Sequence, residues 1–141
     1  MRRCVVDASV VIKWMQPQRD GEADVTFALE LLFAYKRDEL AISQPVHWLA
    51  EVAAVLARLS PDTLQDDMTD LHALELPLAD NSAIWQVACS LAISLNHHLF
   101  DTLYHAVALC TLGTQLVTAD RHYYEKATSK GAIVLLNDWR L

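Results

Sequence analysis

Several features are scarce in this chain of 141 residues, and each absence narrows what the chain can do. It contains only three glycines, which excludes a glycine-rich loop that cradles phosphates. No apolar run reaches the roughly 20 residues needed to cross a bilayer. The apolar segment after Arg2 and Arg3 meets Asp7 after three residues, which is too short for a signal peptide. We therefore expect a cytoplasmic protein without membrane contact.

Cysteine is also rare. The three cysteines (Cys4, Cys89 and Cys110) are odd in number, far apart and surrounded by apolar residues. This pattern predicts reduced core cysteines rather than a disulfide framework. None of them lies in a pattern typical of a Cys/His nucleophile.

Positive charge is absent from a long central stretch. The net charge is −7, and no Lys or Arg lies between Arg58 and Arg121. This balance excludes a general basic grip on nucleic acid. The acids from Asp62 to Asp80 predict a solvated face. Lys13 and Arg121 each follow a strand-end aspartate within a few residues, so they are our candidates for weak contacts with a polyanionic substrate.

The chain alternates apolar strands with helical patterns. We expect strands at 2–6, 40–43, 75–78, 115–118 and 132–136, and helices at 9–15, 22–38, 45–59, 61–74, 82–95, 101–112 and 121–129. Strands that alternate with helices predict an α/β fold of three layers, with a central, mainly parallel five-stranded sheet. The length and the 53% hydrophobic content suit one domain spanning 1–141.

Two of the expected strands end at an aspartate. Asp7 follows the first strand, and Asp120 follows the strand at 115–118. The working crevice of an open α/β sheet lies outside the carboxyl ends of its strands, so both carboxylates are sent to that edge. Such carboxylates repel each other and lose solvation unless positive charge lies between them.

Two further acids lie in apolar helices. Glu51 has no Lys or Arg within five residues, and Asp101 has none within ten. A carboxylate in such a context needs a partner, and oxygen ligands of this kind suit Mg²⁺ or Mn²⁺. Each acid alone could instead be a cap, a turn residue or an exposed helix residue. An ion pair between Asp120 and Arg121 would remove Asp120 from a metal site.

Histidines accompany both helix-borne acids. His47 and Glu51 are spaced i, i+4, so His47 could donate a hydrogen bond to Glu51. His97, Asp101 and His105 have the spacing of a zinc site on one continuous helix. Because the helix is expected to begin near Asp101, His97 falls in the preceding loop, and ordinary surface or core histidines are favoured.

Four segments, each weak alone, occur in an order that is fairly specific. The chain resembles the PIN-domain ribonucleases, above all the VapC-type toxins of bacterial and archaeal toxin–antitoxin pairs, at 5–10 (VVDASV), around Glu51, at 101–108 (DTLYHAVA) and at 116–120 (LVTAD). The resemblance covers the whole chain. One departure is Ala54, where this family often has asparagine.

The resemblance implies a PIN-like domain and an endoribonuclease that hydrolyses RNA phosphodiesters with water activated at carboxylate-bound Mg²⁺ or Mn²⁺. It assigns catalysis and metal binding to four acids and a supporting role to two hydroxyls, namely Asp7, Glu51, Asp101 and Asp120, and Ser9 and Thr118. The alternatives are a PIN-like nuclease without an antitoxin and a non-catalytic binding module. A phosphatase of another α/β fold fits less well, because Asp7-Ala8-Ser9 lacks a second aspartate.

Two protein partners are also expected. The helix at 22–38 is apolar nearly all round, which is typical of a helix with a partner contact. By the family resemblance, an antitoxin segment would lie there and bring a basic side chain to the carboxylates. The same resemblance implies a homodimer through helices such as 81–95.

Overall fold

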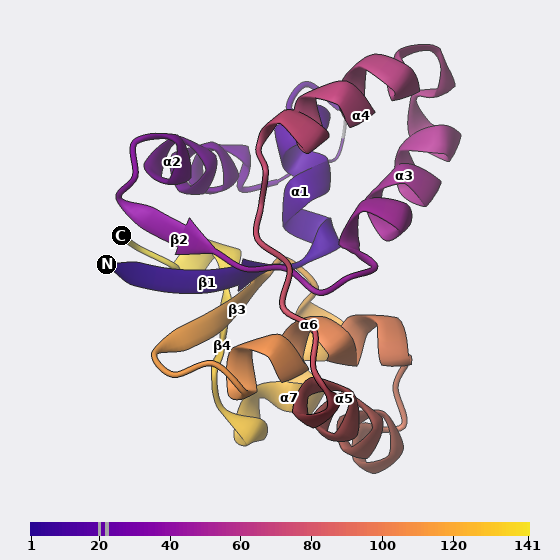
Figure 1. The fold of residues 1–141 in the computed structure, drawn as a ribbon. Helices are drawn as coiled ribbons and strands as arrows, with labels where there is room; N and C mark the ends of the chain where they lie inside the picture. Colours follow the sequence, from indigo (N-terminus) through magenta and orange to yellow (C-terminus); the bar gives the residue numbers. More distant parts are fainter. Residues whose placement is uncertain (20, 22) are drawn as a thin grey trace.

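A computed structural model describes residues 1–19, 21 and 23–141. In these residues the sheet has four strands, β1 (Arg2–Val6), β2 (Leu40–Ile42), β3 (Thr114–Thr118) and β4 (Ile133–Leu135). Their order is β2-β1-β3-β4, and every neighbouring pair is parallel (Figure 1). The two central strands, β1 and β3, therefore send their carboxyl ends to one edge of the sheet.

The prediction of five strands was wrong. The segment 75–78 contributes only an isolated parallel bridge between Gln44 and Leu78. Glu75 has a left-handed backbone (φ 51°), which breaks an extended run at its first residue. Pro77 has no N–H to donate to a neighbouring strand, so continuous pairing cannot develop there.

Seven helices lie in the described part of the chain. They are α1 (Ala8–Met15), α2 (Val25–Lys36), α3 (Trp48–Leu59), α4 (Leu64–Ala73), α5 (Ser82–Leu95), α6 (Leu99–Leu109) and α7 (Arg121–Ala127). Short 3₁₀ turns follow α3, α7 and β4, at Pro61–Thr63, Thr128–Lys130 and Leu136–Asp138. Helices α1 and α2 pack on one face of the sheet and α6 and α7 on the other, which confirms the three-layer prediction; α3 and α4 extend from α1, and α5 packs on α6 (Figure 1).

The helix ends show where local sequence signals were sufficient. Of the two candidate caps for α5, Asn81 and Ser82, the structure uses Asn81, whose side chain accepts a hydrogen bond from the Ile84 N–H (3.0 Å). Helix α6 begins at Leu99, two residues earlier than predicted, with His98 at the N-cap position. Helix α2 is described from Val25; the predicted start at Glu22 lies outside the described residues.

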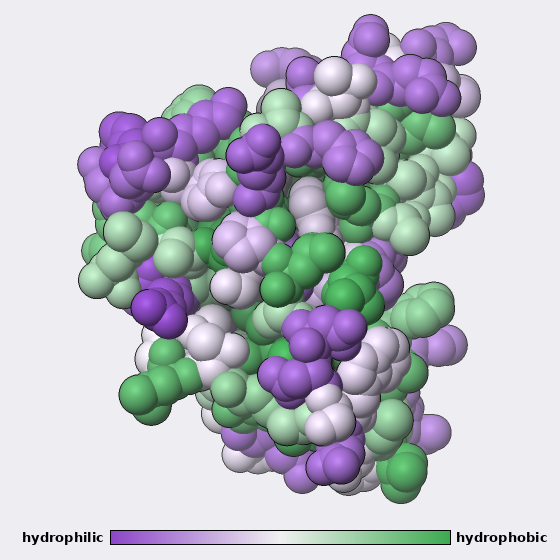
Figure 2. Space-filling view, viewed as in Figure 1, coloured by the Kyte–Doolittle hydropathy of each residue, from purple (hydrophilic) through white to green (hydrophobic). Residues whose placement is uncertain are grey.

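The exposure of the acids agrees with the sequence prediction, whereas the exposure of the cysteines agrees only in part. The acids around α4 are mostly exposed, and hydrophilic side chains gather over this helix in Figure 2. Cys4 is buried as expected, whereas Cys89 and Cys110 are exposed, so the prediction of three core cysteines was wrong for two of them. Within the described ranges, no helix is both long enough and apolar enough to cross a membrane.

Candidate acidic active site

Asp7 is fixed at the carboxyl end of β1 by its own turn and by β3. Its backbone N–H donates to the carbonyl of Val117 (3.0 Å). Its carboxylate caps α1 and accepts hydrogen bonds from the Ser9 N–H (3.0 Å) and the Ser9 hydroxyl (2.5 Å). The Ser9 hydroxyl in turn accepts from the Ala119 N–H (3.0 Å). Ser9 therefore ties the Asp7 carboxylate to the end of β3.

Asp120 occupies the matching position after β3. Its Oδ1 accepts a hydrogen bond from the Tyr123 N–H (3.1 Å) and caps α7. Its own N–H donates to the Thr118 hydroxyl (3.0 Å). Arg121 is exposed and forms no ion pair with Asp120 in the part of the chain that the structure describes. The contact that would have removed Asp120 from the acidic set is not made.

Glu51 lies in the first turn of α3 beside His47. The His47 Nε2 lies 3.1 Å from Glu51 Oε2, so the two side chains are neighbours, but the predicted hydrogen bond between them is not formed in the described residues. Instead, the same nitrogen makes its hydrogen bond to the Phe100 carbonyl (2.8 Å). Glu51 Oε2 and His47 Nδ1 are both buried and lack a hydrogen-bond partner among the described residues. A buried carboxylate oxygen without a donor is costly, so this position has unmet capacity for a ligand.

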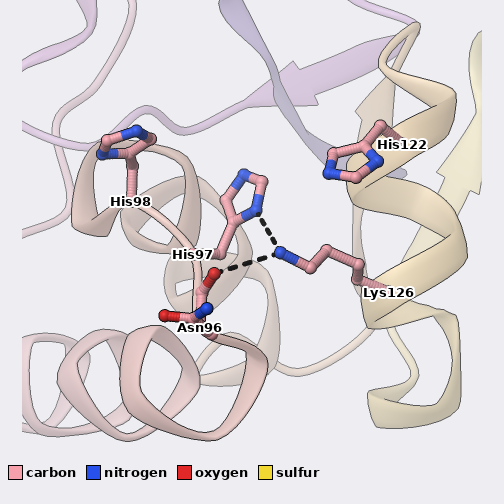
Figure 3. Close-up of a pocket in the computed structure, with 5 residues that line it drawn as sticks. All are labelled: Asn96, His97, His98, His122 and Lys126. Carbon is pink, nitrogen blue, oxygen red and sulfur yellow. Dashed lines mark hydrogen bonds between the residues drawn. The ribbon is translucent and has the colours of Figure 1, made fainter.

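Asp101 is the third residue of α6 and is held by a histidine. Its Oδ2 lies 2.7 Å from His97 Nε2. On the other side of the ring, His97 Nδ1 lies 3.1 Å from the Lys126 ammonium (Figure 3). An ammonium only donates, so His97 Nδ1 accepts and Nε2 carries the proton that is donated to Asp101. Lys126 also donates to the Asn96 carbonyl (3.1 Å). The nearby cation that the local sequence lacks is therefore Lys126 of α7, which is linked to Asp101 by hydrogen bonds through His97.

Tyr104 lies in the middle of these acids. It is fully buried, and its hydroxyl has no hydrogen-bond partner in the described residues. Burial raises the pKa of Tyr104; the charges of Glu51 and Asp7 raise it further, and so does the close approach of its hydroxyl to the Glu51 carboxylate. Tyr104 is therefore a core aromatic whose hydroxyl faces the acidic region.

The acids influence one another's ionisation. Burial raises the pKa of Asp7 to about 7; the two Ser9 hydrogen bonds oppose the shift, and the charges of Asp101 and Glu51 add to it. Burial also raises the pKa of Asp101; the His97 hydrogen bond opposes this, whereas Glu51 and Asp120 add to it. Each of the four acids is thus electrostatically linked to at least one other, although they come from four separate elements.

The carboxylate oxygens of this region suit a hydrated hard cation better than a metal ion enclosed by protein ligands. No group of three or more His, Cys, Asp or Glu side chains in the described ranges is arranged to hold a metal ion. Mg²⁺, however, usually keeps several waters and is held by one or two carboxylates. Glu51 Oε2 lacks a partner, and the ionised form of Asp7 is disfavoured without one. These carboxylates fit Mg²⁺ or Mn²⁺ that retains most of its water.

The zinc alternative does not fit. His105 Nδ1 lies 2.9 Å from the Tyr123 hydroxyl, and its Nε2 lies 2.7 Å from the Gly131 carbonyl. Burial lowers the pKa of His105, which favours the neutral ring. His105 is therefore a core histidine with both nitrogens occupied. Lys13, one of the two candidates for substrate contact, is buried in the last turn of α1 rather than lying on the surface.

Three contributors to this region were not assigned to the acidic site from the sequence. Gln44 is buried, and its side-chain amide donates to the Val6 carbonyl and accepts from the Val6 N–H (both 2.8 Å), immediately before Asp7. His97 and Lys126 form the link to Asp101. The shared His–acid spacing of i, i+4 was the signal available for His97; nothing local marked Gln44 or Lys126.

An apolar cavity of about 220 Å³ adjoins the Glu51 side of the site. Its walls come from α3 and α6, and the lining residues are His47, Ala50, Glu51, Ala54 and Phe100. Ala54, the departure noted in the sequence, therefore lies beside the acidic site and leaves open space there instead of a polar side chain.

The sequence matches no family model and no curated protein. Solved structures with a similar fold include a toxin–antitoxin complex from Klebsiella pneumoniae, with a TM-score of 0.63 and 15% identity over 98% of this chain and 99% of that chain. Another is PAE2754 from Pyrobaculum aerophilum, with a TM-score of 0.65 and 18% identity over 96% of this chain and 90% of that chain. At these identities the likeness shows that the α/β fold is shared across nearly the full length of the chain.

Proposed function

We propose that this protein is a PIN-like, metal-dependent endoribonuclease of the VapC type. The observation that carries the proposal is that Asp7 and Asp120 follow neighbouring parallel strands at one edge of the sheet, close enough to Glu51 and Asp101 for these acids to affect one another's pKa. Glu51 and Asp101 come from helices on opposite sides of that sheet. The family resemblance assigns the same four residues to the acidic site.

One or two carboxylates of this acidic set at a time would hold a hydrated Mg²⁺ or Mn²⁺, and the cation would activate water and neutralise charge on the phosphodiester. Ser9 orients the Asp7 carboxylate through two hydrogen bonds. His97 occupies one oxygen of Asp101, which leaves the other for the cation. Glu51 Oε2 is a buried oxygen that accepts no hydrogen bond in the described residues, although His47 Nε2 lies 3.1 Å away. The protein thus supplies positioned carboxylate oxygens and keeps their helices in place.

The cellular role that we propose is the toxin of a toxin–antitoxin pair. A solved structure with the same fold is a toxin–antitoxin complex. Helix α2 buries much of its apolar surface against α1 and β2, yet Phe33 remains 48% exposed. We propose this side of α2 as the antitoxin surface. Helix α5 leaves Trp85 and Ile93 exposed, and we propose it as the homodimer surface. A monomeric mass in light scattering would count against the dimer.

Cleavage of total RNA by the purified protein tests the nuclease. With Mg²⁺ or Mn²⁺, we expect defined products whose mapped ends carry a 5′-phosphate. Asp7→Asn and Asp101→Asn, which preserve side-chain size, should each abolish cleavage and toxicity while circular dichroism shows a folded protein. Undiminished cleavage by both variants would exclude the acidic site as the catalytic centre.

A non-catalytic binding module is the second candidate. It is favoured by the lack of a preformed three-ligand group in the described residues. Isothermal titration with Mn²⁺ separates the two functions, because an absence of binding at millimolar metal would favour the binding module. A PIN-like nuclease without an antitoxin would cleave RNA, yet its gene would have no small neighbouring reading frame whose product blocks toxicity.

A further inference from the structure

A pocket rich in histidine lies beside the acidic site. Its volume is about 530 Å³, and its lining side chains come from the loop between α5 and α6 and from α7: Asn96, His97, His98, His122 and Lys126 (Figure 3). No acidic residue lines it, although the chain has a net charge of −7. The pocket therefore differs in charge from the carboxylates next to it.

Several N–H groups of the pocket remain available to a ligand. Lys126 has three ammonium hydrogens and directs hydrogen bonds to two protein atoms. His98 and His122 are exposed, and their rings contact only the His97 ring (centroids 6.2 and 6.0 Å away) without a hydrogen bond to any described residue. A neutral imidazole still donates one N–H. In contrast, both nitrogens of His97 are engaged in hydrogen bonds, and its Nδ1 accepts the hydrogen bond that positions Lys126.

Donors of this kind match an anion with several acceptor oxygens. The Lys126 ammonium and the imidazoles of His98 and His122 line one cavity that has no carboxylate among its lining residues, which suits a phosphate group. A metal ion fits poorly, because no three His, Cys, Asp or Glu side chains of the described ranges have metal-binding geometry and a lysine ammonium lies among the histidines.

The pocket is physically joined to the proposed catalytic site. His97 hydrogen-bonds Asp101 at 2.7 Å, and His122 follows Asp120 by two residues on α7. We infer that this pocket binds a backbone phosphate of the RNA that flanks the phosphodiester at the acidic site. The inference rests on the proposed ribonuclease function. Such a pocket would give this acidic protein a local contact for a polyanion. Contacts to phosphates position a nucleic acid without reading its sequence.

Binding of a fluorescein-labelled single-stranded RNA tests this site. The Asp7→Asn protein prevents cleavage, and fluorescence anisotropy is measured over a series of KCl concentrations. Adding Lys126→Met to that protein should weaken binding by about tenfold for RNAs of different sequence. It should also reduce the slope of log affinity against log salt by about 0.7. Lys130→Met is the matched control, since Lys130 is an exposed cation of the next turn outside the pocket, and it should change neither quantity.

A second variant separates phosphate binding from the role of Lys126 in holding His97. His98→Glu leaves the Lys126–His97 and His97–Asp101 hydrogen bonds in place and adds a negative charge at the rim. It should weaken RNA binding by about tenfold or more, whereas the neutral His98→Gln should have a smaller effect. Unchanged affinity and salt slope in both Lys126→Met and His98→Glu would overturn the inference.

Other outcomes distinguish this inference from the proposed function. If the pocket variants weaken RNA binding but the wild-type protein never cleaves RNA with Mn²⁺, the phosphate site stands and the ribonuclease fails. If Lys126→Met cleaves RNA with an unchanged KM, the ribonuclease stands and the pocket fails. A poly-glutamate peptide that displaces RNA at equal charge concentration, with the same dependence on Lys126, would identify a site for carboxylate peptides and overturn the assignment to a phosphodiester.

Discussion

The two strand-end acids and the two helix-borne acids are held by different kinds of partner. Asp7 and Asp120 accept hydrogen bonds from backbone N–H groups of the turn that follows each of them. Glu51 and Asp101 instead each face a histidine one helical turn earlier. The strand-end pair is fixed as soon as the strand–turn–helix backbone forms. The helix-borne pair depends on side chains, which rotate and exchange protons.

The two histidines are themselves unequal. His97 is fully engaged, since it donates to Asp101 and accepts from Lys126. His47 keeps an unpaired Nδ1, and its neighbour Glu51 keeps an unpaired Oε2. We therefore expect the Asp101 side to be ordered before a ligand arrives and the Glu51 side to gain most of its order from the ligand.

The largest expected effect is the loss of RNA cleavage when one acid of either class is neutralised. Asp120→Asn from the strand-end pair and Glu51→Gln from the helix-borne pair should each reduce RNA cleavage by on the order of 10³-fold, because both would remove a carboxylate from one cation. Single-turnover cleavage with Mn²⁺ measures this loss. A strong loss in one class alone would show that only that class serves the reaction.

The next effect concerns the stability of the strand-end side. In metal-free protein the pKa of Asp7 is about 7, above its unfolded value of 3.8. The folded state then binds more protons than the unfolded state between about pH 4 and pH 7, so stability falls as the pH rises through that window. Compared with Asp7→Asn, the wild type should lose on the order of 3 kcal/mol across it. Urea unfolding with EDTA at pH 5 and pH 8 measures this, and parallel profiles for the two proteins would contradict it.

A smaller effect tests how the helix-borne side is held. His97→Ala removes the donor to Asp101, and a loss of 10- to 100-fold in metal affinity or cleavage is expected for such a supporting residue. Ala54→Asn is the contrasting variant, because it places a polar group beside Glu51. It should leave the hydrogen bond between His97 and Asp101 in place. Equal cleavage by His97→Ala and wild type would mean that Asp101 needs no support.

The smallest effect has an unusual sign. Tyr104→Phe removes a buried hydroxyl that approaches Glu51 but makes no hydrogen bond of good geometry to any described residue, so the metal-free protein should become more stable by about 1 kcal/mol. Thermal unfolding with EDTA measures the change. A destabilised variant would show that the hydroxyl has a partner in solution.

The local parts of this fold were predictable, and the non-local parts were not. The apolar runs ending at Asp7 and Asp120 and the Asn81 cap are local signals, and the structure places each near its predicted position. The segment 75–78 has strand-like residues, but a single left-handed residue and a proline reduce it to one bridge. Lys126 lies 29 residues after its partner His97, and only the packing of α7 beside α6 brings them together.

The most direct test of a shared cation is a double-mutant cycle in Mn²⁺ affinity at pH 8, measured by isothermal titration. Asp7→Asn represents the strand-end acids, and Glu51→Gln represents the helix-borne acids. If one cation is held by both classes, each variant should weaken Mn²⁺ binding, and the double variant should lose much less than the sum of the two losses. Additive losses, or no Mn²⁺ binding by the wild type at millimolar concentration, would contradict a shared metal site.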